Sequence, residues 1–145
     1  MRSFVRHSCL GLSLLVAGAS AAWSDETQRP WSQTEVVALT EQLSAALDAL
    51  VADPGLNAEQ ATAYQQRSHE AAIATVKQIR PRVAELRKRV ASGSDREVSY
   101  AYFEQVADLR EEVSAYAGEA WLPDATRSKA RRVRALFDRL ARYYQ

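Results

Sequence analysis

Two groups of side chains in this sequence have the types and spacing that chemistry or recognition requires, and the first surrounds a histidine. His69 lies between Ser68 and Glu70. Neighbouring residues of a helix point in different directions, so these three side chains cannot form a catalytic triad. The sequence also contains no glycine-rich phosphate loop, nucleophile elbow or paired-carboxylate motif, and it therefore predicts a protein that is not an enzyme. Because imidazole changes charge near neutral pH, His69 at the edge of an apolar helix face is a candidate pH-sensitive contact. The alternative is a boundary histidine with one ring nitrogen in water.

The second group combines aromatic and arginine side chains near the ends of predicted helices. This mixture is typical of protein contact surfaces, and it also suits contact with anionic lipid headgroups. The candidate partner-binding residues are Tyr100, Phe103, Arg139, Arg142, Tyr143 and Tyr144. We expect their partner to be a protein of the cell envelope, with weak contact to an anionic membrane surface as a further expectation.

The amino-terminal residues indicate export. Arg2 and Arg6 precede an apolar run over residues 9–19, and an A-x-A cleavage site ends at Ala21. This order predicts a secretory signal peptide over residues 1–21, because the apolar run is shorter than the ~20 residues that span a bilayer. The mature chain is expected in the periplasm without a transmembrane segment. A retained membrane anchor is the alternative.

The composition of the mature chain argues against several functions. The full sequence holds 19 basic and 18 acidic side chains, and the loss of Arg2 and Arg6 leaves a net charge of −1. Nucleic-acid-binding domains are usually strongly basic, so no such role is expected. The single cysteine and the single methionine both lie in the segment that is removed. The mature chain then has no disulfide, and we expect no cofactor and no metal site.

The elements that would position these side chains are helices. Residues 22–31 are polar and lack periodicity, so they predict a flexible leader, and helical periodicity covers most of residues 32–145. Capping-box pairs predict three of the helix starts: Ser32 with Glu35, Asn57 with Gln60, and Ser94 with Glu97. The predicted helices cover about residues 32–53, 57–91, 94–122 and 125–145.

Short connections decide how these helices are arranged. Breaks of only a few residues make each helix fold back against its predecessor, and four apolar stripes at heptad spacing then close on one core. The sequence predicts an all-α, up-down-up-down antiparallel four-helix bundle over residues 32–145, as a monomer or homodimer. Pro81 interrupts the second helix, where we expect a kink, with a break after Arg80 as the alternative.

Charge alternates along the predicted helices and allows two interpretations of the arginine-rich ends. Residues 76–90 hold 6 basic and 1 acidic side chains, and residues 123–145 hold 7 and 2, whereas the intervening segment is acidic. The basic ends could neutralise neighbouring acidic helices, or they could form the binding surface that contains Arg139 and Arg142.

Two resemblances add expectations about function. The predicted bundle resembles the cytochrome b562 and cytochrome c′ group, which implies a small-ligand or haem carrier, although only His69 remains as a ligand to iron. Residues 56–60 (LNAEQ) resemble the L-T-x-x-Q motif of the periplasmic Spy/CpxP stress chaperones, with Asn57 in place of threonine. That resemblance implies a protein-binding role. The expected function is a non-enzymatic, exported protein-binding or chaperone-like accessory module, and the alternative is a small-ligand or haem carrier.

Overall fold

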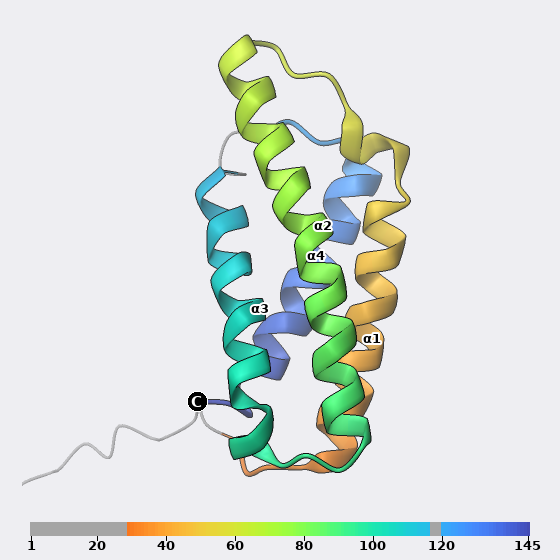
Figure 1. The fold of residues 1–145 in the computed structure, drawn as a ribbon. Helices are drawn as coiled ribbons and strands as arrows, with labels where there is room; N and C mark the ends of the chain where they lie inside the picture. Colours follow the sequence, from red (N-terminus) through yellow and green to blue (C-terminus); the bar gives the residue numbers. More distant parts are fainter. Residues whose placement is uncertain (1–28, 117–119) are drawn as a thin grey trace, which may run out of the picture.

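The computed structural model describes residues 29–116 and 120–145, and within them it is all-helical, with four α-helices and no strand. The elements are α1 (Gln33–Val51), the short 3-10 helix η1 (Pro54–Asn57), α2 (Ala63–Ala91), α3 (Arg96–Tyr116) and α4 (Asp124–Ala141) (Figure 1). The predicted signal peptide and residues 22–28 of the predicted leader lie outside the described residues. No helix in the described ranges is both long enough and apolar enough to cross a membrane.

The start of α2 differs from the prediction. Asn57 does not cap it, because Asn57 is the last residue of η1. Thr62 caps α2 instead, and its hydroxyl accepts a hydrogen bond of 3.2 Å from the amide of Gln65. The predicted partner in the capping box, Gln60, has a different use: its side chain exchanges hydrogen bonds of 3.0 and 2.9 Å with the backbone of Trp121. The α1–α2 connection is thereby tied to the α3–α4 connection.

The turn between α2 and α3 is built on a glycine. Gly93 has a φ of +93°, in the left-handed region that glycine adopts most readily. The following amide, of Ser94, donates to the carbonyl of Arg89 at 3.1 Å, which is the Schellman arrangement. Asp95 then caps α3 by accepting from the amide of Val98 at 3.0 Å, so the predicted cap at Ser94 is wrong by one residue.

Helix α2 continues through Pro81, so the alternative of a break after Arg80 is wrong. Proline removes the hydrogen bond to the carbonyl of Lys77. Both Pro81 and Lys77 are exposed, so water can satisfy that carbonyl.

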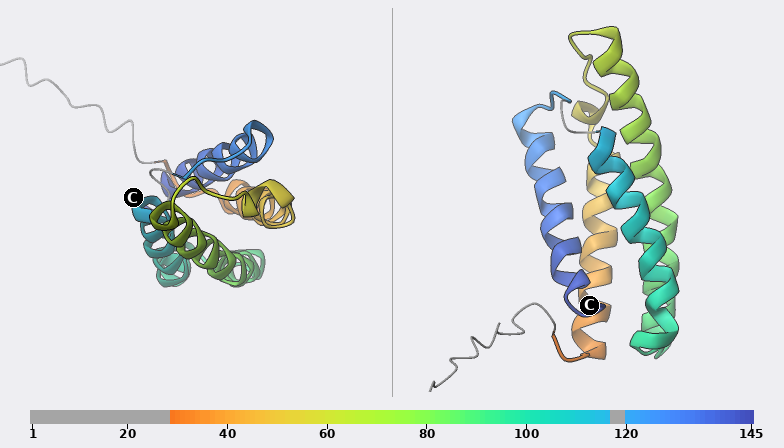
Figure 2. Two further views of the ribbon diagram at one scale, coloured as in Figure 1. Left: turned by 90° about the horizontal axis from the view of Figure 1, so that it is seen from above. Right: turned by 90° about the vertical axis from the view of Figure 1, so that its left-hand side faces the viewer.

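The packing of the helices is uneven. Helix α2 packs along both α1 and α3, and α4 packs on α1, whereas α3 and α4 share much less contact (Figures 1 and 2). The predicted stripes of α1 and α2 are accordingly buried, including Leu43, Leu47, Val83 and Leu86. The predicted stripe of α3 is buried only in part: Val106 is buried, Val113 is half-buried and Tyr116 is exposed. The four stripes therefore do not close completely along the seam between α3 and α4.

The two ends of the molecule hold the helices together. At one end, which we name the Tyr144 pole, Gln33 near the start of α1 donates to the carbonyl of Val90 at the end of α2, and Tyr143 donates to Glu35. At the other end, which we name the Trp121 end, Asp53 after α1 accepts from Lys129 of α4 at 2.5 Å. Residues 29–31 also reach the Tyr144 pole, where the Arg29 amide donates to the carbonyl of Arg142 at 2.8 Å.

Candidate functional site

The structure corrects the placement of three predicted contact residues. Tyr143 is 2% exposed, Tyr144 is 4% exposed and Phe103 is also buried, so all three belong to the core. After α4 the chain continues in a tight turn, in which the amide of Tyr144 donates to the carbonyl of Ala141 at 3.0 Å, and the two rings lie inside the molecule.

These buried rings form an aromatic cluster at the Tyr144 pole. Phe103 of α3 stacks on Tyr144 with ring centroids 4.2 Å apart, and on Phe137 of α4 with centroids 5.6 Å apart. Trp31 meets Tyr144 edge to face at 5.4 Å. Ser99 donates to a backbone carbonyl at 2.5 Å, so the Tyr144 hydroxyl is the donor in their 2.9 Å hydrogen bond. Burial raises the pKa of Tyr144 above its ordinary value. The cluster closes the α3–α4 seam at this pole.

Three of the predicted contact residues remain at the surface. Tyr100 is 44% exposed, and Arg139 and Arg142 are both exposed. Neither arginine forms an ion pair within residues 29–116 and 120–145. Tyr100 and Arg142 line a wide, shallow hollow at the Tyr144 pole.

His69 is also placed differently from the prediction. It is 3% exposed, so it lies inside the fold and not at the edge of an apolar helix face. Its Nε2 donates to the carbonyl of Leu56 at 2.8 Å, since a carbonyl only accepts. Leu56 belongs to η1, which the sequence did not predict, so this hydrogen bond ties η1 to α2.

A groove lies between α3 and α4 beyond the aromatic cluster, toward the Trp121 end. Its volume is about 440 Å³, which is within the range of pockets that hold small ligands. We name it the α3–α4 groove. Apolar side chains from all four helices line it, among them Leu43, Leu47, Val76, Val106, Val113 and Val133, and His69 reaches it from α2.

The groove is also lined by arginine. Arg127, Arg131 and Arg134 come from α4, where spacings of four and three residues place them along one face, and Arg110 comes from α3. No aspartate or glutamate is among the described residues that line the groove. An apolar floor with a cationic border suits a molecule that is apolar along its length and negatively charged at one end.

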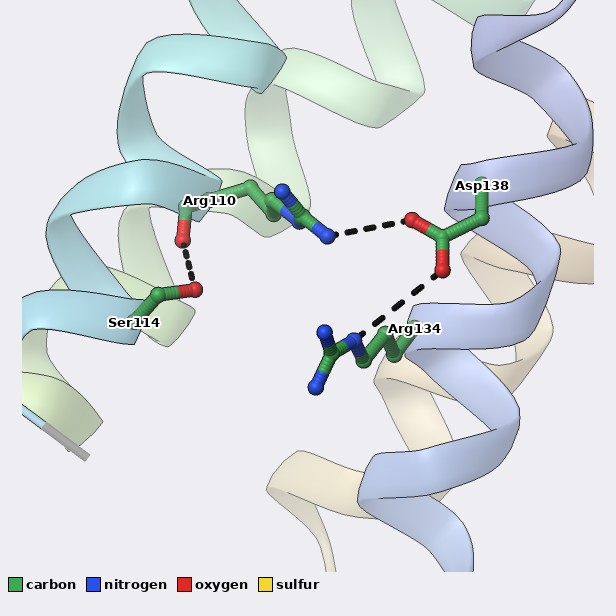
Figure 3. A network of polar contacts seen from close by, with 4 residues as sticks. All are labelled: Arg110, Ser114, Arg134 and Asp138. Atoms are coloured by element: carbon green, nitrogen blue, oxygen red, sulfur yellow. Dashed lines mark hydrogen bonds and ion pairs between the residues drawn. The ribbon is translucent and has the colours of Figure 1, made fainter. Parts of the chain in front are cut away.

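One polar network crosses the seam beside the groove (Figure 3). Arg110 of α3 donates to the Asp138 carboxylate of α4 at 3.0 Å, and the Nε of Arg134 lies 4.0 Å from the other carboxylate oxygen. The Arg110 guanidinium also lies 5.3 Å from the centre of the Phe137 ring. Arg110 and Phe137 line both the α3–α4 groove and the shallow hollow beside Tyr100 and Arg142, so this network lies between the two.

The residues of the groove offer little to a metal or haem iron. Within the described part of the chain, no three His, Cys, Asp or Glu side chains gather into a metal-binding group. His69 would have to release the carbonyl of Leu56 before its Nε2 could bind iron.

Sequence reasoning missed the groove and its arginines. The signal was present, because Arg127, Arg131 and Arg134 share a helical face with the apolar Ala130 and Phe137. From the sequence, we interpret these arginines as groups that neutralise neighbouring acidic helices, and that interpretation does not predict a ligand-binding site. Comparison of the chain with protein-family models, with curated proteins and with solved structures finds no match. The candidate site therefore depends on its own geometry.

Proposed function

We propose that this protein is an exported, non-enzymatic binding protein that holds a single-chain apolar molecule in the α3–α4 groove. The observation that supports it is an apolar hollow of about 440 Å³ within a small helical fold. Protein interiors normally pack to the density of organic crystals, with few voids larger than a water molecule. Val113 and Val133, which line this groove, are only half-buried, and an apolar ligand would cover them.

The proposal includes the arrangement and the location of the chain. We take the four helices as an up-down-up-down bundle that is open along the α3–α4 seam, a reading supported by the contacts at the Tyr144 pole and the Trp121 end. We also propose cleavage after Ala21 and release into the periplasm. Intact mass of protein from the periplasmic fraction tests this, with a chain that begins at Ala22 as the expected result. Retention of Met1 in washed membranes would contradict it.

A groove-filling substitution tests ligand binding. Nile red, an uncharged dye whose emission rises and shifts to the blue in apolar surroundings, serves as the probe. We expect saturable binding by the wild type, and at least about tenfold weaker binding by Ala130→Phe, because the ring would occupy the groove. Ala101→Phe places the same ring on the exposed face of α3 and serves as the matched control. Equal binding by both variants, with unchanged melting temperatures, would refute the proposal.

A second candidate function is protein binding at the Tyr144 pole. The exposure of Tyr100, Arg139 and Arg142 around the polar hollow favours it. The burial of Phe103, Tyr143 and Tyr144 removes most of the aromatic anchors that a contact surface would use. We therefore rank it below ligand binding in the groove.

A further inference from the structure

We infer that the molecule held in the α3–α4 groove is a single-chain fatty-acid anion whose carboxylate binds Arg131. This inference rests on the proposed function and adds the chemical class of the ligand. It follows from the volume of the groove, the charges on its border and the partners of each arginine.

The volume suits one acyl chain. A methylene group takes about as much space as a water molecule in the liquid, ~30 Å³. The 440 Å³ of the groove is then enough for one chain of roughly a dozen carbons. A lipid with two such chains needs about twice that space.

The charges on the border select an anion. Four arginines line the groove without any acidic side chain among the described residues. An uncharged alcohol can accept a hydrogen bond from these guanidinium groups but gains no charge attraction, and a cationic amphiphile would be repelled by them. A fatty-acid anion can place its carboxylate beside the arginines at the mouth and its acyl chain against the apolar side chains of the floor.

The partners of the arginines point to Arg131. Arg127 donates to Asp124 at 3.3 Å and to the carbonyl of Leu122 at 3.0 Å. Arg110 and Arg134 share the Asp138 carboxylate. Within residues 29–116 and 120–145, Arg131 has neither an ion pair nor a side-chain hydrogen bond.

One available guanidinium matches one carboxylate. The planar fork of arginine binds a carboxylate through two parallel hydrogen bonds. A phosphate monoester carries up to two negative charges and more acceptor oxygens, and it would need further donors that are already engaged here. The geometry therefore favours a carboxylate over a phosphate.

Calorimetric titration of the purified mature chain with four twelve-carbon probes below their micelle concentrations tests the inference. We expect dodecanoate to bind 1:1 and about tenfold or more tightly than dodecan-1-ol, with dodecyltrimethylammonium weakest, because a hydrogen-bonded charge pair is added only in the first case. Raising the salt concentration should weaken dodecanoate and leave the alcohol unchanged. Binding of dodecyl phosphate more than tenfold tighter than dodecanoate would overturn the choice of carboxylate.

A pair of neighbouring arginines supplies the variant and its control. Arg131→Gln should weaken dodecanoate about tenfold and change dodecan-1-ol less than about twofold. Arg132→Gln removes the same charge from an exposed position that does not line the groove, and it should change neither. Equal effects of the two variants would overturn the role of Arg131.

If alcohol and carboxylate bind equally well and Ala130→Phe abolishes both, the inference fails while the proposed function stands. If no probe binds, both fail.

Discussion

Replacing Tyr144 with alanine tests whether the aromatic residues at the end of the chain belong to the core or to a contact surface. Tyr144 is buried, stacks on Phe103, meets Trp31 edge to face and donates a hydrogen bond to Ser99. If Tyr144 belongs to a contact surface, the substitution should weaken partner binding and leave the stability of the folded protein unchanged. If Tyr144 belongs to a core cluster, the folded protein should lose stability whether or not a partner is present.

The structure sets the size of the effect. Truncation of a buried aromatic side chain to alanine costs about 3–5 kcal/mol. Tyr144 lies in a turn after α4 and not within a helix, so the backbone can relax and we expect a loss near the lower limit, about 3 kcal/mol. Tyr144→Phe keeps the stacking and loses only the hydroxyl. Because Ser99 still donates to the carbonyl of Asp95 at 2.5 Å, this change should cost no more than about 1 kcal/mol.

Urea unfolding and thermal melting measure these differences. For a domain of this size, about 3 kcal/mol corresponds to a fall in melting temperature of roughly 10 °C or more. Tyr100→Ala is the control, since Tyr100 lies at the same pole but is 44% exposed, and its loss should stay below about 1 kcal/mol. A Tyr144→Ala protein that melts with the wild type would show that the aromatic cluster does not hold the seam closed.

Three further predictions follow from other parts of the structure. The ammonium group of Lys129, and then the Gly55 amide, hold the pKa of the Asp53 carboxyl below its ordinary value. The ionised Asp53 carboxylate therefore stabilises the folded state above about pH 4, and this contribution disappears as the pH falls through the lowered pKa of Asp53. Asp53→Asn should reduce the urea midpoint at pH 7 and change it much less near pH 2.5. An equal reduction at both pH values would contradict the ionic role of Asp53. Gly55→Ala should destabilise the fold by about 1–3 kcal/mol, because the added methyl would collide with a buried side chain at the start of α4, and an unchanged melting temperature would contradict that packing. The double change of Arg139 and Arg142 to glutamate should shift the melting temperature little, because neither forms an ion pair within the described residues, while crosslinking to any envelope partner at this pole should be lost. A fall of several degrees with crosslinking intact would assign these arginines to the fold.

The helices could be predicted from the sequence because their apolar spacing is regular. The stripes of α1 and α2 are buried as predicted, and α2 runs through Pro81, which lies at an exposed position. The predicted cap at Asn57 failed for a local reason. Pro54 and Gly55 begin a 3-10 turn, and this turn moves the start of α2 to Ala63.

The candidate site was harder to predict because it arises from unequal packing. A stripe of apolar residues on α3 indicates burial, but it does not show that α4 packs on α1 and leaves Val113 half-buried. The same limit applies to Arg131. Its place beside Ala130 was visible in the sequence, but only the position of α3 turns that helical face into the border of a groove.

Methyl NMR of the mature chain, with leucine and valine labelled, tests ligand binding in the α3–α4 groove most directly. On titration with dodecanoate, we expect saturable shifts of the methyl groups of Leu47, Val113 and Val133, which line the groove. The methyl groups of Val36 and Val90, which are buried in the core but do not line it, should move little. Absence of saturable shifts, or equal shifts at both sets of residues, would contradict the proposal that this groove is a ligand-binding site.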